Sequence, residues 1–195
     1  MRGMLVAVCA TLSLAMPAAA VELSQKGTAV LIQGSIKDGD QFRLREFLAR
    51  PEAAQIRTVY LDSPGGRIDP AREMARQIRE KGYTTVVDAA RARCESACTG
   101  LFVAGSRRLY LNAAAISDGE GKIKRGLGFH EGNSSQPVGG RGYSGSATSG
   151  MVNIYYEMGV PGAASLVTKA AFNRMYHVSA QTALLLGIAT GLSGP

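Results

Sequence analysis

The stretch IRTVYLDSPGG, at residues 56–66, joins an apolar, β-rich run to a tight turn that contains proline and two glycines. The helix that follows is opened by Asp69 and Pro70, because Asp caps helices well and Pro suits the first helical position. Its apolar residues recur at helical spacing until Gly82 closes it. A strand, a glycine turn and an amphipathic helix are half of a βαβ unit, so this stretch predicts a parallel sheet.

The same alternation of strands and helices extends on both sides of this stretch. Further strands are predicted at residues 28–34, 83–87, 107–111 and 127–130, and helices at 41–49, 96–104, 151–158, 163–175 and 179–186. Alternation of this kind produces right-handed crossovers and places binding sites at the carboxyl ends of the strands. The predicted fold is therefore a single α/β domain whose last elements are helices.

Composition narrows the class of protein. The chain has 195 residues, of which 46% are hydrophobic and 19% charged, which excludes a disordered, collagen-like or multi-span membrane protein. The net charge of +7 comes from residues spread along the sequence. A nucleic-acid-binding surface would cluster them with aromatic residues, so no nucleic acid is expected as a partner. Arg72, Arg76 and Arg79 share one predicted helix and are interpreted as its solvated face.

The N-terminus has the pattern of a secretory signal peptide. Arg2 precedes an apolar run at residues 4–16, and Ala20 ends an A-x-A cleavage site. The alternative, an uncleaved anchor, is disfavoured because a membrane span needs about 20 apolar residues. We expect residues 1–20 to be removed by cleavage after Ala20, and residues 21–195 to form one exported domain, periplasmic or secreted, without a membrane span.

Two cysteines remain after this cleavage, Cys94 and Cys98. One helical turn brings residues at this spacing to a Cα–Cα distance of about 6 Å, which a disulfide can bridge. An oxidising compartment favours the disulfide. The alternative, a metal site, lacks a second pair of ligands, so we expect a disulfide and no metal or other cofactor.

The stretch RCESACTG, at residues 93–100, places a serine where a loop becomes a buried helix. Ser96 would lie beside the free N–H groups of a helix N-terminus, and the N–H of Ala97 could point at an oxyanion. Thirty residues upstream, Gly65 and Gly66 would let backbone N–H groups approach a substrate carbonyl. The alternatives are a serine that only caps the helix and a plain turn between a strand and a helix.

A histidine that could accept the proton of this serine ends a predicted apolar strand. His130 follows Gly128 and Phe129, and a histidine is the usual base for a serine nucleophile. The alternative is a half-buried structural histidine. His177 is the second histidine of the chain and is ranked behind His130 as the base.

Four motifs together carry a family resemblance: LIQGSI (31–36), VYLDSPGG (59–66), CESACTGLFVAG (94–105) and GFH (128–130). In this order they resemble the proteolytic subunit of Clp protease and, more broadly, the Clp/crotonase fold, which includes the serine-type signal peptide peptidases. The resemblance covers most of the chain and is strongest to an exported bacterial branch of that fold. It implies a Clp/crotonase-like parallel sheet with βαβ crossovers and C-terminal helices.

The resemblance also implies roles for the residues of these motifs. Ser96 matches the nucleophile of the family and His130 its general base. The backbone N–H groups of Gly66 and Ala97 match its oxyanion hole.

Substrate contacts are implied at Gly65 and from Gly132 onward, where a peptide would bind by β-addition. Residues 132–150 are rich in Gly and Ser and are expected to be either a mobile functional loop or a locally disordered segment. Proteins of this fold commonly assemble into rings or trimers, so the resemblance also implies a homo-oligomer.

One catalytic residue of the family has no clear counterpart. The third member is an acid well after the histidine, but no Asp follows His130, and the matching position falls near Met175, with Asn173 close by. Either a Ser–His dyad acts alone, or Asn173 or a backbone carbonyl orients the histidine, or the site is inactive. The polar segment 117–126 lengthens the path between Ser96 and His130 and is expected to bulge outward.

These observations predict an exported serine hydrolase that cleaves peptide bonds in short or unfolded peptides. The sequence has no nucleotide-binding motif, so the activity is expected to be independent of ATP and of any cofactor. Two alternatives stay open. One is an inactive peptide-binding module of the same fold, which the missing acid favours, and the other is an ester or thioester hydrolase. Export argues against a coenzyme A thioester, since that cofactor is cytosolic.

Overall fold

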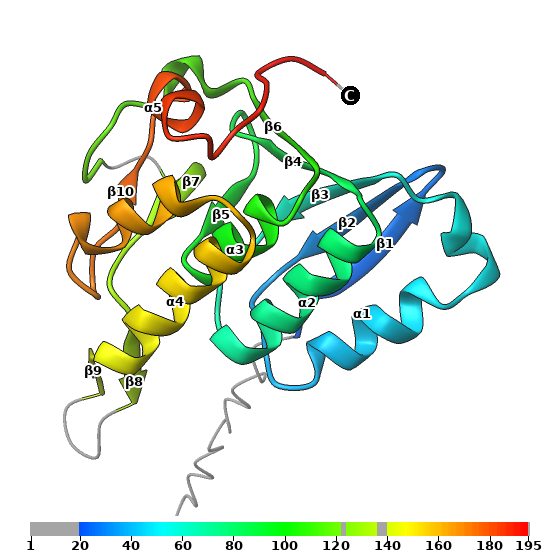
Figure 1. Ribbon diagram of the computed structural model, residues 1–195, viewed down its shortest axis with the longest axis horizontal. Helices are drawn as coiled ribbons and strands as arrows, with labels where there is room; N and C mark the ends of the chain where they lie inside the picture. Colours follow the sequence, from blue (N-terminus) through cyan, green and yellow to red (C-terminus); the bar gives the residue numbers. More distant parts are fainter. Residues whose placement is uncertain (1–19, 122–123, 136–139, 195) are drawn as a thin grey trace, which may run out of the picture.

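A five-stranded sheet forms the centre of the protein in the computed structural model, which describes residues 20–121, 124–135 and 140–194 (Figure 1). The strands lie in the order β1 (Glu22–Lys26), β2 (Ala29–Gln33), β3 (Thr58–Asp62), β4 (Thr84–Asp88) and β6 (Arg107–Leu111). From β2 to β6 all neighbours are parallel, which confirms the predicted parallel sheet. The polar strand β1 was not predicted and pairs antiparallel with β2 at the edge.

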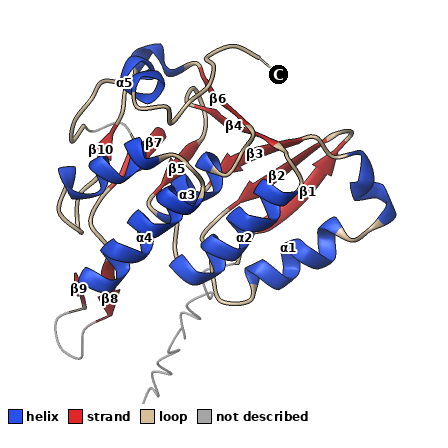
Figure 2. Ribbon diagram, in the orientation of Figure 1, coloured by secondary structure: helices blue, strands red, loops and turns tan. Residues whose placement is uncertain are grey.

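Helices pack on one face of this sheet (Figure 2). They are α1 (Asp40–Leu48), α2 (Ile68–Glu80) and α3 (Ala97–Val103), and α4 (Gly145–Glu157) packs against α2 and α3. The buried face of α2 consists of the predicted apolar residues. Its start differs from the prediction, because the helix begins at Ile68 with Arg67 as the N-cap. Asp69 and Pro70 therefore lie in the first turn, where a negative charge is favourable and a missing N–H costs nothing.

A second, smaller sheet brings distant segments together. It has the order β10 (Tyr176–His177), β7 (Gly126–Phe129) and β5 (Arg93–Glu95), with β7 parallel to β5 and antiparallel to β10. The register places Gly128 opposite both Glu95 and His177. An isolated bridge between Ser63 and Cys94 joins this sheet to the turn after β3.

The C-terminal part differs from the sequence prediction in two segments. Within residues 132–150, which were expected to be a loop, the structure has β8 (Asn133–Ser135), β9 (Arg141–Tyr143) and the start of α4. The helix predicted at 163–175 is instead a 3-10 helix, η3 (Pro161–Lys169), followed by turns. The helix predicted at 179–186 is present as α5 (Ala180–Leu185), and two short 3-10 helices, η1 (Pro51–Gln55) and η2 (Ala113–Ala115), complete the elements.

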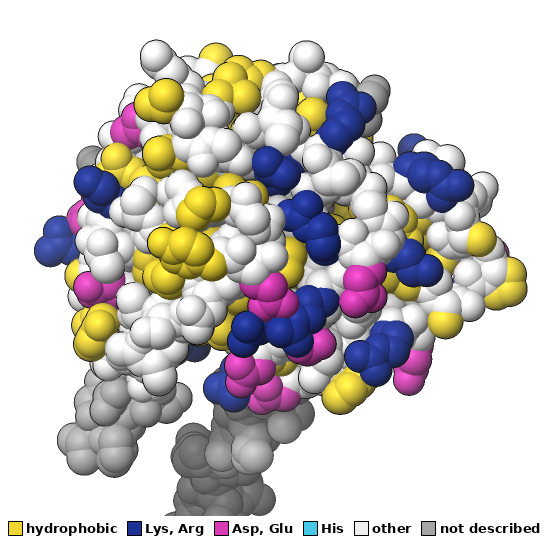
Figure 3. Space-filling view, viewed as in Figure 1, with side chains coloured by type: hydrophobic (Ala, Val, Ile, Leu, Met, Phe, Trp, Pro, Cys, Tyr) yellow, Lys and Arg dark blue, Asp and Glu magenta, His cyan; other side chains and the backbone are white. Residues whose placement is uncertain are grey.

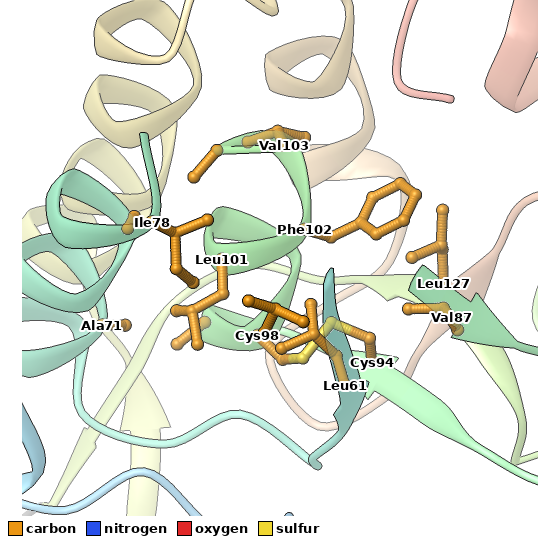
Figure 4. Packing of buried hydrophobic residues seen from close by; sticks show 14 of the residues in the cluster. Leu61, Ala71, Ile78, Val87, Cys94, Cys98, Leu101, Phe102, Val103 and Leu127 are labelled. Atoms are coloured by element: carbon orange, nitrogen blue, oxygen red, sulfur yellow. A yellow bond between two sulfur atoms is a disulfide. The ribbon is translucent and has the colours of Figure 1, made fainter. Parts of the chain in front are cut away.

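The core contains the expected disulfide. Cys94 and Cys98 are bonded at 2.00 Å, their Cα atoms are 5.1 Å apart, and both residues are fully buried. Figure 4 shows the two sulfurs among apolar side chains that include Leu61 of β3 and Leu101 of α3. The disulfide therefore ties β5 to the first turn of α3 and spans the turn that contains Ser96.

The sequence suggested that the arginines of α2 form a solvated face. In the structure they also bind groups on neighbouring helices. Arg72 donates to Glu157 of α4 at 2.7 Å, and Arg76 pairs with the same carboxylate. Arg79 donates to the backbone carbonyls of Val103 and Met158. These contacts connect α2 with α3 and α4, and basic and acidic side chains are interspersed on this face of the molecule (Figure 3).

The predicted signal peptide falls almost entirely on residues 1–19, which lie outside the described residues. Its cleavage after Ala20 therefore stays a prediction. Among the residues that the structure describes, no helix has both the length and the apolar character needed to cross a membrane.

Candidate active site

Ser96 occupies a sharp turn between β5 and α3. Its backbone angles are φ 53° and ψ −128°, a conformation that residues other than glycine rarely adopt. The Ser96 N–H donates to the carbonyl of Gly128 at 2.9 Å, and the Ser96 carbonyl accepts the N–H of Thr99 at 2.9 Å and its hydroxyl at 2.6 Å. Strand-to-helix turns with this strain present a nucleophile at the top of a sheet in many hydrolases.

The glycine turn after β3 lies directly against Ser96. A Cβ atom at Gly65 would lie 2.8 Å from the Ser96 Cβ and 2.8 Å from the amide nitrogen of Ala97. Gly66 is equally confined, since its Cβ would lie 2.1 Å from the carbonyl oxygen of Ile36. Among the described residues, the N–H groups of Gly66 and Ala97 have no protein acceptor. Two unused backbone donors therefore lie near the serine, as an oxyanion hole requires.

A cavity of about 730 Å³ opens over this turn. Its lining includes five of the residues singled out from the sequence, Gly65, Gly66, Ser96, His130 and Asn173. The size is ordinary for a site that holds a small molecule or part of a peptide.

His130 follows β7 and is half-buried in this cavity. Burial lowers the pKa of His130, and the charge of Arg141 acts in the same direction, while the carboxylate of Glu95 and the nearby backbone of Glu131 and Phe172 raise it. The net result is a pKa below the ordinary value, so the ring is neutral at pH 7 and can accept a proton. Ser96 and His130 share the cavity but are not hydrogen-bonded, and catalytic contacts are often long before substrate binds.

The His130 ring has one nitrogen without a partner. Its Nδ1 atom is buried and has no hydrogen bond within the part of the chain that the structure describes. The backbone of Phe172 is close enough to affect the ring, although it does not meet hydrogen-bond geometry with Nδ1. The side chain of Asn173 is exposed at the cavity. The backbone carbonyls of Glu131 and Phe172 act on the His130 ring and raise its pKa.

Glu95 and His177 form a buried pair in the same cavity that the sequence did not reveal. Glu95 is 7% exposed and His177 is 3% exposed. The Nε2 atom of His177 lies 3.3 Å from Oε1 of Glu95, and Nη1 of Arg93 lies 3.5 Å from Oε2. The pair meets above Gly128, where a Cβ would lie 3.0 Å from the Glu95 Cγ and 2.7 Å from the Met175 Cγ. Period-two alternation from Cys94 could have placed Glu95 on the cavity face, but strand β10, with two residues, has no sequence signal.

Gly132 was expected to contact substrate, but in the structure it lies against the start of helix α4. It is buried, its N–H donates to Thr148 Oγ1 at 2.9 Å, and its carbonyl accepts the Ser144 N–H at 2.9 Å. A Cβ there would lie 2.5 Å from the Ala147 Cβ. Gly132 therefore fixes the start of α4 and is not in the cavity lining, whereas its neighbour Asn133 is.

The described residues contain no group of three or more side chains suited to hold a metal ion. Groups of the kinds found here can support nucleophilic acyl transfer without a metal, because a histidine can move the proton of a serine and free amides can stabilise an oxyanion.

Neither a protein-family model nor a curated protein sequence matches this chain. Solved structures do share its fold. The 1510-N membrane-bound stomatin-specific protease, in a serine-to-alanine mutant, has a TM-score of 0.61 at 15% identity, covering 85% of this chain and 77% of that chain. A lysine-to-alanine mutant of the same protease, in complex with a substrate peptide, has a TM-score of 0.59 at 13% identity and covers 85% and 73%. An enoyl-CoA hydratase/isomerase from Marinobacter aquaeolei has a TM-score of 0.50 at 12% identity and covers 90% and 70%. The chain therefore has the Clp/crotonase-like α/β fold that its motifs implied.

Proposed function

We propose that this protein is an ATP-independent serine hydrolase that cleaves peptide bonds. The observation that carries the proposal is the strained Ser96 turn, which lines one cavity together with Gly66 and the neutral ring of His130 and has the free amides of Gly66 and Ala97 beside it. A serine that only capped a helix would not need this conformation, and Ser96 makes no side-chain capping bond to α3.

The chemistry follows from these positions. The Ser96 hydroxyl attacks the carbonyl carbon of the peptide bond while His130 takes the hydroxyl proton. The oxyanion of the tetrahedral intermediate accepts hydrogen bonds from the N–H groups of Gly66 and Ala97. His130 then returns the proton to the departing amine, which leaves an acyl–serine ester. Water attacks this ester, with His130 again as the base, and the carboxylic acid product leaves.

Glu95 takes the place of the missing acid in this proposal. Its carboxylate favours the protonated form of His130, so it would stabilise the imidazolium that forms during each proton transfer. A backbone carbonyl, of Glu131 or Phe172, would accept an N–H of that imidazolium. Asn173 has no role in this scheme.

Peptides are proposed as substrates because the fold is shared with a protease whose structure contains a substrate peptide. The buried disulfide and the predicted signal peptide support export to an oxidising compartment, where ATP-driven unfolding is absent. A homo-oligomer remains a proposal from the family resemblance.

Labelling with a fluorophosphonate tests the activated serine. The full chain, expressed with its N-terminal segment, should be labelled on Ser96, as located by mass spectrometry. Ser96→Ala should abolish labelling and His130→Ala should slow it at least a hundredfold. Ser165→Ala, a substitution outside the cavity, is the matched control and should leave the labelling rate unchanged.

Failure of the folded, oxidised protein to label would favour the alternative, an inactive peptide-binding module. If the protein labels but cleaves only esters or thioesters, the ester-hydrolase alternative is correct. Labelling that survives His130→Ala but not replacement of His177 would instead assign the base to His177.

A further inference from the structure

The cavity around Ser96 has an excess of positive charge. Five of its lining residues are Lys or Arg, and only two are acidic. Both acids already have partners, since Glu95 pairs with His177 and Arg93, and Glu120 accepts a hydrogen bond from Arg174 at 2.9 Å. The remaining cations therefore have no counter-charge in the cavity.

These cations, Lys37, Lys124 and Arg141, are here called the basic rim. Within the described residues none of them has an ion-pair partner. They come from three separate segments, the loop after β2, the segment before β7, and strand β9, and all three line the cavity. Uncompensated charges that converge on a concave surface produce a potential that attracts anions.

The basic rim lies close to the reacting groups. Lys37 follows Ile36, whose N–H donates to the carbonyl of Gly65 at 2.8 Å, so it is next to the proposed oxyanion hole. At the other end of the site, the charge of Arg141 reaches His130. An anion held by the basic rim would therefore be part of the substrate near the bond that is cut.

We propose that the site prefers peptides that carry a carboxylate close to the scissile bond, a proposal that rests on the peptidase function above. Carboxylates are the anions that peptides possess, either as Asp and Glu side chains or as the free C-terminus. Nucleic acid is a poorer fit, because Phe172 is the only Phe, Tyr or Trp among the residues lining this cavity, which leaves little surface on which successive bases could stack. A bound carboxylate would also offset the effect of Arg141 on His130.

Internally quenched peptides that differ at one position test the preference. Peptides with Glu, Gln or Lys at each position beside the cleaved bond are compared, together with C-terminal acids and amides. We expect kcat/KM to be about fivefold higher for Glu than for Gln for each cation contacted, and lowest for Lys. The preference should shrink when NaCl is raised to 0.5 M, because salt screens partly exposed charges. The acid–amide comparison separates a side-chain carboxylate from the C-terminus.

Substitutions in the basic rim show which cations cause the preference for Glu peptides. Lys37→Gln and Lys124→Gln should each reduce the rate on Glu peptides and leave the rate on Gln peptides nearly unchanged. Arg141→Gln should reduce the ratio of the Glu rate to the Gln rate, while its effect on the pKa of His130 changes both rates alike. Lys169→Gln is the control, since this residue is on η3 and does not line the cavity. Equal rates on all peptides, or equal losses on Glu and Gln peptides in every rim variant, would overturn the proposal.

A binding measurement separates this proposal from the proposed catalysis. Ser96→Ala cannot form the acyl–serine, but it should still bind a fluorescent Glu peptide more tightly than the Gln peptide, as measured by anisotropy. Tighter binding of the Glu peptide by a protein that fluorophosphonate does not label would retain the basic rim and reject the peptidase. Labelling of Ser96 together with equal binding of the Glu and Gln peptides would retain the peptidase and reject the carboxylate preference of the basic rim.

Discussion

The Nε2 atom of His177 lies 3.3 Å from Oε1 of Glu95, and these two buried side chains meet above Gly128 of the strand between them. Glu95 directly precedes Ser96 in the chain, and the carbonyl of Gly128 accepts the Ser96 N–H at 2.9 Å. One row across the small sheet thus holds the backbone where it enters the serine turn. The conformation of the proposed nucleophile depends on this row as well as on the helix that follows.

The substitution Glu95→Gln tests whether the negative charge of Glu95 contributes to catalysis. The carboxylate of Glu95 raises the pKa of His130, so its removal should lower that pKa. Because His130 must be neutral to act as a base, the acid limb of the kcat/KM profile should move to lower pH. The plateau should fall roughly tenfold, since the imidazolium loses a counter-charge. Glu95→Asp keeps the charge and should restore the position of the acid limb, and Glu46→Gln on the surface of α1 should change neither quantity. An acid limb that stays in place in Glu95→Gln would remove Glu95 from the mechanism.

Gly65→Ala tests the contact between the glycine turn and the Ser96 turn. Gly65 has φ +85°, and the added Cβ would lie 2.5 Å from the carbonyl oxygen of Glu95 and 2.8 Å from the Ala97 nitrogen. We expect the free energy of unfolding to fall by about 3 kcal/mol and fluorophosphonate labelling to be lost, since backbone atoms on both sides must move. Gly82→Ala is the matched control, because Gly82 also has a positive φ but open space around it. It should cost about 1 kcal/mol in urea denaturation and leave labelling intact.

The spacing of apolar residues along the sequence correctly predicted the helix α2 and the strands of the parallel sheet. The apolar face of α2 and the strands of the parallel sheet have clear periodicity, and each is present close to its predicted bounds. The disulfide followed from the spacing of Cys94 and Cys98 together with the expected compartment. The convergence of Ser96 with Gly65 came from the family resemblance and from the rule that sites form at the carboxyl ends of parallel strands.

The elements that were predicted wrongly or missed depend on contacts between segments that are far apart in the sequence. Helix α4 begins within a glycine- and serine-rich segment because Ser144 caps it, and because Gly150 allows close approach to Ile68, 3.2 Å from where its Cβ would lie. The segment predicted as a helix at 163–175 begins instead within η3, whose Gly162 packs tightly against a distant segment, since its Cβ would lie 2.1 Å from the carbonyl oxygen of Leu186. The pairing of His177 with Glu95 joins residues 82 positions apart, which no sequence period reports.

Glu157→Gln should change the pH dependence of stability. The hydrogen bond from Arg76, with further contributions from Arg72, lowers the pKa of Glu157 below its usual 4.5. A carboxyl whose pKa is lowered in the folded state stabilises the protein above its unfolded pKa, and this contribution is lost as the pH falls through the folded value. The variant should therefore be less stable than the parent by about 0.5–1 kcal/mol at pH 7, and the difference should shrink as the pH is lowered from 4.5 to 3.

Urea denaturation across this pH range measures the difference. Glu80→Gln is the control, since Glu80 is exposed on α2 and forms no ion pair with the described residues. A constant difference between Glu157→Gln and the parent from pH 7 to pH 3 would show that the loss comes from packing and not from charge.

The double substitution Cys94→Ala and Cys98→Ala tests how the Ser96 turn keeps its conformation. The disulfide spans this turn on the core side, and it closes a short loop that restricts the unfolded chain by about 2 kcal/mol. Without it, the φ of 53° at Ser96 is maintained by the hydrogen bonds to Gly128 and Thr99 and by packing against Gly65. We expect the variant to unfold at lower urea and to label with fluorophosphonate several-fold more slowly. Because both sulfurs are fully buried, dithiothreitol should have little effect on labelling of the native parent. Labelling of the variant at the parental rate would mean that these hydrogen bonds and this packing alone hold the nucleophile, and that the disulfide serves only stability.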